Sequence, residues 1–287
     1  MQIFHFGEDL KQRLNALRKE GKSIGFVPTM GALHPGHLSL LKQASENCAV
    51  VVVSIFVNPT QFNEVSDFEN YPSTLTKDIA LLSKESCDIL FTPAVKEMYP
   101  DGTKVQGQYN LGYIEEILEG KYRPGHFQGV CQIVDRLLDI VNPDQLYLGE
   151  KDFQQCKVIQ KLLSLTGRQS ITKLVISPTI RESDGLAMSS RNQRLNEIER
   201  GKASLIYQCL MQLKKDFKKE ALQSALANAK LFLSGEGFEV DYVEIIDETT
   251  FLPVSENNHS KNLRALVAAK IGAIRLIDNM PICLQVK

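Results

Sequence analysis

The chain has 287 residues, a length that favours two domains or one large domain with an appendix. Its 33 basic and 34 acidic residues give a net charge of −1, so bulk charge predicts neither a nucleic-acid nor a membrane partner. The apolar run at 48–57 is too short to cross a bilayer, and the first residues do not resemble a secretory leader. Six scattered cysteines without a C-x-x-C pair are expected to be reduced thiols. We therefore expect a soluble, cytoplasmic protein.

The first 177 residues alternate between helical and extended patterns. Extended stretches are expected at 23–27, 50–57, 88–91, 145–149 and 171–177. Helices are expected at 8–20, 38–47, 73–86 with Ser73 as N-cap, 128–141 and 152–165. This alternation predicts an α/β fold, a parallel sheet with helices on both faces.

The pattern changes after about residue 177. Two long helical stretches, 196–217 and 220–233, precede alternating segments at 238–247 and 263–278. Alternation of this kind is typical of antiparallel strands with one solvated face. The sequence therefore predicts a second, smaller α+β domain.

Polar stretches follow four of the predicted strands: PTMGALHPGH at 28–37, NPTQF at 58–62, GEKD at 149–152 and TIRESDGLAMSSRN at 179–192. Ligands of open parallel sheets bind beyond the carboxyl ends of the strands. Four such stretches at one edge predict a single site.

The first stretch contains residue types that suit phosphate binding. Gly31 and Gly36 allow close backbone approach, and a helix beginning near His37 is expected to offer N–H groups and a positive dipole end. His34 and His37 can donate hydrogen bonds to phosphate oxygens. A purely structural histidine pair and a metal-binding pair are the alternatives, although no third ligand is evident nearby.

The later stretches add cations and hydroxyls. Lys151 can neutralise phosphate, and Asp152 can either cap the following helix or help to hold a magnesium–phosphate unit. Ser189, Ser190 and Arg191 extend this set. A surface lysine and an ordinary loop are the alternatives. No G-x-G-x-x-G run occurs, which disfavours a dinucleotide-dependent oxidoreductase.

Five motifs together resemble the pantothenate synthetase (pantoate–β-alanine ligase) family: PTMGALHPGH, VNPTQF, RPGHFQGV at 123–130, YLGEKDFQQ at 147–155 and AMSSRN at 187–192. The resemblance covers essentially the whole chain, in the order and spacing of the family. The His-x-Gly-His part alone is shared by the wider superfamily of nucleotidyltransferases and class I aminoacyl-tRNA synthetases. Five motifs in register are therefore more specific than that pattern.

The resemblance implies a reaction and an architecture. Pantoate and ATP would give pantoyl adenylate and pyrophosphate, and β-alanine would then attack the adenylate to give pantothenate and AMP, with Mg²⁺ accompanying ATP. Residues 1–177 would form a Rossmann-like domain that binds ATP and pantoate. Residues 178–287 would form a smaller C-terminal lid domain. The family also implies a homodimer.

The resemblance further implies site residues. Catalytic roles fall to His34, His37, Lys151, Ser189, Ser190 and Arg191, with His37 as the usual proton donor. The ATP site would comprise Met30, Gly31, Ala32, Leu33, His34, Pro35, Gly36, His37, Gly149, Glu150, Lys151, Asp152, Ile180, Met188, Ser189, Ser190 and Arg191. Glu150 receives no side-chain role, and Asp152 is the candidate Mg²⁺ ligand. Gln61 and Gln155 would bind the substrates, pantoate in particular, with β-alanine beside it.

Two other functions remain open at this point. Another nucleotidyltransferase of the superfamily would share the histidine motif but lack the contexts of Gln61 and Gln155. A nucleotide-sensing module without turnover would lack a phosphate-contacting residue, and the sequence retains all of them. Pantoate-dependent formation of AMP separates these functions.

Overall fold

The computed structural model describes residues 1–63, 65–103, 108–217, 221–254 and 262–283. The chain forms two compact units, Met1–Pro178 and Thr179–Lys287. Within the described ranges, no helix combines the length and the apolar character needed to span a membrane.

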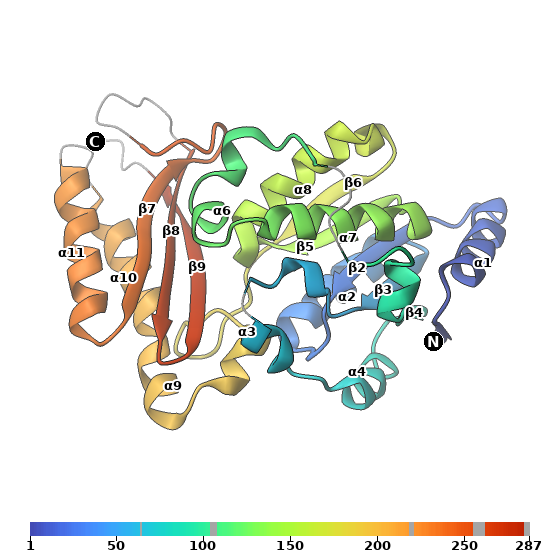
Figure 1. Ribbon diagram of the computed structural model, residues 1–287, viewed down its shortest axis with the longest axis horizontal. Helices are drawn as coiled ribbons and strands as arrows, with labels where there is room; N and C mark the ends of the chain where they lie inside the picture. Colours follow the sequence, from blue (N-terminus) through green and yellow to red (C-terminus); the bar gives the residue numbers. More distant parts are fainter. Residues whose placement is uncertain (64, 104–107, 218–220, 255–261, 284–287) are drawn as a thin grey trace. The chain divides into compact units, whose positions relative to one another are not determined.

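The first unit is built on a six-stranded sheet in the order β1-β4-β3-β2-β5-β6 (Figure 1). All of its strand pairs are parallel, which confirms the predicted sheet. Its strands are β1 (Gln2–Phe4), β2 (Ile24–Thr29), β3 (Val50–Ile55), β4 (Ile89–Phe91), β5 (Gln145–Gly149) and β6 (Lys173–Ser177). The sequence pattern did not predict β1, a three-residue edge strand that pairs with β4.

Helices cover both faces of this sheet, as predicted. The unit contains α1 (Gly7–Lys19), α2 (Pro35–Asn47), α3 (Val65–Glu69), α4 (Leu75–Leu82), α5 (Val95–Met98), α6 (Glu119–Tyr122), α7 (His126–Val141) and α8 (Phe153–Leu165). Its short 3₁₀ helices are η1 (Pro59–Gln61), η2 (Gly112–Glu115), η3 (Glu150–Asp152) and η4 (Arg168–Ser170).

Two hydrophobic cores result from the alternation of side chains along the strands. Phe26 of β2 belongs to the core formed with α1, α7 and α8, whereas Val27 belongs to the core formed with α2 and α4. Strands β2 and β3 are therefore apolar on both faces, as expected for central strands of a parallel sheet.

The strand order reverses direction between β2 and β5 (Figure 1). The chain proceeds from β2 to β3 and β4 on one side, and from β5 to β6 on the other. The two loops that follow β2 and β5 therefore diverge, and a crevice between them is the usual ligand site of such a sheet. The histidine stretch follows β2, and GEKD begins at Gly149, the last residue of β5.

The second unit contains an antiparallel sheet in the order β7-β8-β9, with Gly272 in the turn between β8 and β9. Its elements are η5 (Ser190–Arg194), α9 (Glu197–Ala203), α10 (Leu205–Asp216), α11 (Leu222–Gly235), β7 (Glu239–Asp247), β8 (Asn262–Ile271) and β9 (Ile274–Cys283). Residues of α10 and α11 share a core with the sheet, including Leu210, Leu233, Val243 and Val267. The unit is α+β, as predicted.

Three expectations need correction. The helix expected at 196–217 is two helices, because α9 ends at Ala203 and α10 begins at Leu205. The helix expected at 73–86 is shorter, and Thr74, not Ser73, occupies its N-cap position. The helix expected from residue 220 begins at Leu222 in the structure, and residue 220 itself lies outside the described residues.

Candidate active site

The turn between β2 and α2 has an unusual backbone. Gly31 and Ala32 both have positive φ, at 83° and 49°. The Gly31 N–H donates to Thr29 Oγ1 at 3.2 Å, and the N–H groups of Ala32 and Leu33 donate to the two carboxylate oxygens of Asp78, each at 2.9 Å. Side chains of the protein therefore accept from three consecutive amides of the turn.

Asp78 lies in the first turn of α4, and its exposed fraction is 3%. Thr74 Oγ1 donates to the same carboxylate at 3.0 Å. Among the described residues, no lysine or arginine forms an ion pair with it. A side chain at Gly31 would lie 3.2 Å from Asp78 Oδ2 and 3.1 Å from Ile55 Cγ2, and the positive φ disfavours one as well. Glycine is therefore required where the turn meets the carboxylate.

The two histidines stand at the start of α2. His34 is the N-cap, and its N–H donates to His37 Nδ1 at 3.3 Å. The ring centroids lie 4.0 Å apart. Because Nδ1 of His37 accepts this bond, the proton of its neutral ring resides on Nε2. His34 Nδ1 is buried without a partner among the described residues, which also favours the tautomer protonated at Nε2.

Free backbone N–H groups were expected at the start of the helix near His37, but most of them are absent or already hydrogen-bonded. The helix begins at Pro35, which has no N–H, and the amides of His37 and Leu38 donate to the His34 carbonyl at 2.8 and 3.2 Å. In the described part of the chain, the Gly36 amide is left without an acceptor. The turn therefore offers a ligand mainly histidine side chains and one amide.

Both imidazoles are neutral at pH 7 in the ligand-free protein. Burial, followed by the charge of Lys151, lowers the pKa of His34 from 6.5 to about 4, although Asp152 acts in the opposite direction. Burial, then the neighbouring His34 ring and Lys151, lowers the pKa of His37 from 6.5 to about 3. Because β2 and β5 are hydrogen-bonded neighbours in the parallel sheet, the loops that follow them leave the same edge side by side.

Lys151 lies in η3, with Nζ 3.5 Å from Asp152 Oδ1. The Lys151 side chain is 16% exposed and the Asp152 side chain 45% exposed. Asp152 occupies the N-cap position of α8, yet its side chain makes no capping hydrogen bond. The alternative interpretation of Asp152 as a helix cap is therefore wrong, and its carboxylate lies beside the Lys151 ammonium group.

Gln61 comes from η1, after β3. Asn58 Nδ2 donates to Gln61 Oε1 at 3.2 Å, and Gln61 Nε2 contacts Met30 Sδ at 2.9 Å. Asn58 is itself held, because its Oδ1 accepts from Tyr99 Oη at 2.6 Å and its exposed fraction is 1%. The Gln61 amide is thus oriented beside the turn that carries the histidines.

The backbone of η1 is fixed against α7 and the segment before it. The Gln61 carbonyl accepts from Arg123 at 3.2 Å and from Nδ1 of His126 at 2.8 Å. At Gly129 in α7, a Cβ would lie 2.2 Å from the Thr60 carbonyl oxygen. The RPGHFQGV motif therefore supports the loop that presents Gln61.

The neighbouring glutamines of α8 differ in their contacts. Gln154 is buried, with Oε1 accepting from the Glu119 N–H at 3.0 Å and Nε2 donating to the carbonyls of Ile114 and Ile117. Gln155 is half-buried, and no described residue hydrogen-bonds to its side-chain amide. Gln154 therefore supports the loop at residues 114–119, whereas the side-chain amide of Gln155 could bind a ligand.

In the second unit, the 179–192 stretch is ordered by its own contacts. The Met188 N–H donates to the Ile180 carbonyl at 3.0 Å, and Ser189 Oγ accepts from the Arg191 N–H at 3.3 Å as the cap of η5. Arg181 forms a bidentate salt bridge with Asp278, in which its two terminal nitrogens donate to the two carboxylate oxygens at 2.6 and 3.0 Å. These contacts order the hairpin that leads into residues 188–191, of which Ser190 is buried.

Three of the four predicted stretches meet in the first unit. The contact between Gln61 and Met30 joins the loops after β3 and β2, and the effect of Lys151 on the histidines joins the loops after β5 and β2. The fourth stretch belongs to the second unit. The sequence pattern indicated no role for Asn58, Asp78 or His126. For Asp78, the sequence held one indication of burial, because this carboxylate lies four residues before Leu82 and so on the same face of the predicted helix.

The metal alternative for the histidine pair finds no support. Across the described ranges, no group of three or more His, Cys, Asp and Glu side chains could hold a metal ion. A protein-bound metal usually needs three or four such ligands. The pair is therefore better suited to hydrogen bonding than to metal coordination.

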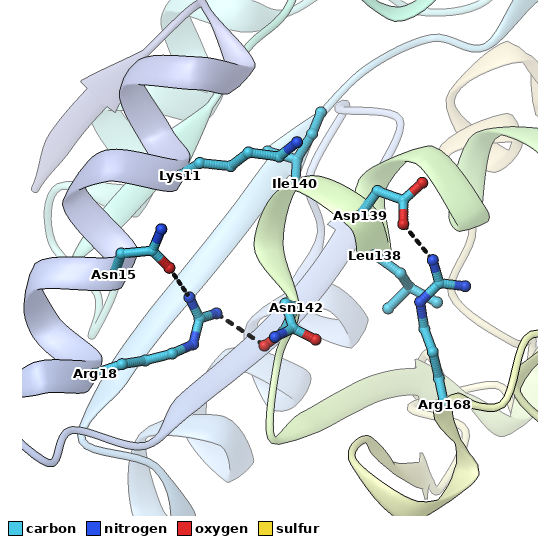
Figure 2. A pocket seen from close by; sticks show the side chains of 8 residues that line it. All are labelled: Lys11, Asn15, Arg18, Leu138, Asp139, Ile140, Asn142 and Arg168. Atoms are coloured by element: carbon cyan, nitrogen blue, oxygen red, sulfur yellow. Dashed lines mark hydrogen bonds and ion pairs between the residues drawn. The ribbon is translucent and has the colours of Figure 1, made fainter.

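A hollow elsewhere in the first unit is separate from this site. It lies between α1 and the end of α7, near the amino end of β5 (Figure 2). Arg18 there donates to Asn15 Oδ1 at 3.1 Å and to the Asn142 carbonyl at 2.8 Å, and Arg168 pairs with Asp139 (Figure 2). Its arginines are thus engaged in helix capping and ion pairs at the edge opposite to Lys151.

The sequence matches one protein family along almost its whole length. Residues 2–281 match the family model described as pantoate–β-alanine ligase. The chain is 40% identical to the pantothenate synthetase of Psychromonas ingrahamii over 287 residues, covering 99% of this chain and 98% of the relative. It is 44% identical to that of Flavobacterium psychrophilum over 284 residues, covering 98% and 99%.

Solved structures resemble the chain over a similar length. The pantothenate synthetase of Thermus thermophilus superimposes with a TM-score of 0.87 at 38% identity, covering 98% of this chain and 99% of that one. The pantoate–β-alanine ligase of Francisella tularensis, solved with β,γ ATP and β-alanine, gives a TM-score of 0.79 at 38% identity, covering 98% and 97%.

The histidine environment predicts a pH dependence. The folded-state pKa values of about 4 and about 3 lie below the 6.5 of an unfolded chain, so the unfolded state binds protons first as the pH falls. The contribution of both rings to the free energy of unfolding is therefore full above pH 6.5 and is lost as the pH falls through about 4 for His34 and about 3 for His37. In ¹H–¹⁵N NMR of the ligand-free protein, His34 and His37 should show no titration between about pH 8 and 5. A midpoint near the ordinary value for either ring would contradict this account.

Proposed function

Because the chain belongs to the pantoate–β-alanine ligase family, we propose that its candidate active site joins pantoate to β-alanine in two steps. Pantoate first attacks the α-phosphate of ATP to give pantoyl adenylate and pyrophosphate. The amine of β-alanine then attacks the acyl carbon, and pantothenate and AMP leave. The family match across residues 2–281 favours this reaction over that of another nucleotidyltransferase, and the relative solved with β,γ ATP and β-alanine supports both ligands.

The observation that carries the proposal is the placement of two neutral imidazoles and Lys151 directly after the neighbouring parallel strands β2 and β5. A carboxylate with an ordinary pKa near 4 is already ionised at neutral pH, so the first step needs no general base. It needs in-line positioning of pantoate and stabilisation of charge on the phosphates. The imidazole N–H donors and the Lys151 cation can provide both the positioning and the charge stabilisation.

We assign distinct roles to these side chains. The Nε2–H groups of His34 and His37 donate to phosphate oxygens, and Lys151 supplies positive charge. The family resemblance makes His37 the proton donor, and the hydrogen bond at its Nδ1 leaves the proton on the outer nitrogen as that role requires. The negative charge of bound ATP would raise the pKa of both rings and so favour their protonated forms.

Mg²⁺ is proposed to accompany ATP. This ion commonly binds through phosphates, waters and one or two carboxylates, without a dedicated protein cage. Asp152 fits that description, because its carboxylate is 45% exposed beside Lys151 and does not cap α8. When bound, Mg²⁺ would neutralise phosphate charge.

Pantoate is proposed to bind Gln61 and Gln155. A neutral amide can bond hydroxyl and carboxylate oxygens while withdrawing less charge from the nucleophile than an arginine would. Asn58 holds the Gln61 amide in one orientation, and Gln155 has an amide that makes no hydrogen bond within the described chain. Both features favour substrate contact, with β-alanine entering beside pantoate.

The second unit is proposed to act as a lid. In this proposal Met188, Ser189, Ser190 and Arg191 bring hydroxyls and a guanidinium to the phosphates, and the backbone of Ile180 meets adenine. The hairpin contacts that order this stretch support the proposed role, since an ordered loop loses less conformational entropy when it binds a ligand. Gly149 and Glu150 are assigned to the ribose and phosphates through their backbone. We further propose a cytoplasmic homodimer, as the family resemblance implies.

The test of this function is an assay of AMP release with ATP and Mg²⁺, omitting pantoate and β-alanine in turn. We expect AMP only when pantoate and β-alanine are both present, and a single turnover of pyrophosphate when β-alanine alone is omitted. Single-turnover pyrophosphate formation in Lys151→Ala, His37→Ala and Arg191→Ala should fall about 100-fold or more, because each removes a donor to developing charge.

Lys161→Ala is the matched control for the loss of a lysine, because Lys161 is exposed on α8. Its rate should equal that of the parent protein. Pantoate-independent release of AMP would point to a different nucleotidyltransferase, and absence of any release would point to a binding module.

Gln61→Ala tests the pantoate assignment. Removing the amide leaves polar groups of bound pantoate unpaired, which typically costs about 1–3 kcal/mol. The KM for pantoate should therefore rise roughly 10- to 100-fold, with the KM for ATP little changed. Steady-state kinetics with each substrate varied measures both. An equal rise for ATP would show that the substitution disturbs the whole site and would remove support for the assignment.

A further inference from the structure

We propose that Asp78 is a positioning residue for adenylation, acting by holding the turn that presents His34 and His37. The inference rests on the proposed function, since it concerns the same site. Asp78 is 46 and 45 residues distant in sequence from the two amides that it accepts from, Ala32 and Leu33. Its role is to fix a backbone, and it is not assigned to the substrate.

Asp78 stabilises an uncommon backbone conformation. Two consecutive positive φ values, at Gly31 and Ala32, are rarely found, and Ala32 lacks the freedom of glycine. Adjacent amides in such a turn form a concave donor site that favours an anion. The Asp78 carboxylate fills this position with one oxygen for each amide, and charge-assisted bonds of this kind are stronger than neutral ones.

The turn held by Asp78 leads directly into the histidine pair. The N–H of the next residue, His34, donates to His37 Nδ1, so the tautomer of His37 depends on where the turn ends. A shift of the Ala32 and Leu33 peptides would move the His34 N–H and the ring bonded to it. The Asp78 carboxylate therefore acts on the reacting region indirectly, through the backbone of the turn and the His37 ring.

The charge of Asp78 is compensated by hydrogen-bond donors. The carboxylate is buried, and it accepts from the Ala32 and Leu33 amides and the Thr74 hydroxyl. A buried carboxylate is well tolerated only when such donors surround it. The turn and the carboxylate thus stabilise each other.

Asp78→Asn is the decisive variant. It keeps the shape of the side chain but turns one end into a donor, so one of the two amides faces an N–H₂ group. We expect kcat for pantoyl adenylate formation to fall about 10- to 100-fold, as for an active-site misplacement of about 1 Å. The KM for ATP should change less than about threefold, because His34, His37 and Lys151 remain present.

Asp144→Asn is the matched control. Asp144 Oδ2 accepts from the Ile24 N–H at 2.6 Å, at the amino end of the same strand whose carboxyl end leads into the turn. At a comparable loss in the urea midpoint, Asp144→Asn should retain its kcat. Equal loss of kcat in both variants would overturn the proposal, because general weakening of β2 would then explain it.

Two further outcomes are decisive. An unchanged kcat in folded Asp78→Asn overturns the inference while leaving the proposed function intact, whereas a parent protein without pantoate-dependent AMP formation refutes the function itself. If Asp78→Asn does not fold, Thr74→Val decides, because it removes one donor to the carboxylate outside the turn. A several-fold fall in kcat at constant KM for ATP supports the proposal, and an unchanged kcat overturns it.

Discussion

The carboxylate of Asp78 bonded to the amides of Ala32 and Leu33 is the contact on which the proposed site depends. A parallel sheet brings the carboxyl ends of its strands to one edge, but it does not determine how the chain leaves each strand. In this protein the chain leaves β2 through two left-handed residues, and a carboxylate from α4 stabilises that path. The start of α2, and hence the location of both histidines, follows from it.

The same contact changes how the site can bind phosphate. A glycine-containing turn at a helix start commonly binds anions through its own amides. Here the amides of residues 31–34 have acceptors within the protein, namely Thr29, Asp78 and His37. In the proposed function, phosphate recognition would therefore depend on the imidazole side chains and the Gly36 amide. Lys151 would supply positive charge in the first unit.

Two rings with centroids 4.0 Å apart cannot readily both be charged, because like charges at that separation disfavour each other. Burial and Lys151 act in the same direction. Neutral rings remain good hydrogen-bond donors, so in the proposed function His34 and His37 would donate hydrogen bonds and Lys151 would neutralise charge. That division of roles suits a first step in which phosphate charge shifts and no base is required.

Strand and helix patterns, and the meeting of three polar stretches at one sheet edge, were predictable because periodicity and parallel topology determine them. The contact between Asp78 and the turn was not, because it depends on how α4 packs more than 40 residues away. Local pattern also missed the break at Ser204, where helical spacing continues on both sides. The expectation of available amides near His37 failed for a local reason, because the helix begins at Pro35 and the amides of His37 and Leu38 donate to the His34 carbonyl. For Ala32 and Leu33, in contrast, the acceptor comes from elsewhere in the fold.

Amide hydrogen exchange in the turn, followed by NMR with and without ATP and Mg²⁺, tests the central claim most directly. The account predicts slow exchange at Ala32 and Leu33 in the ligand-free protein, unchanged by nucleotide, because Asp78 already accepts from both. The Gly36 amide and the Nε2 protons of His34 and His37 should respond only when nucleotide binds. Rapid exchange at Ala32 and Leu33 that becomes slow only with nucleotide would show that these amides bind phosphate, and would contradict the account.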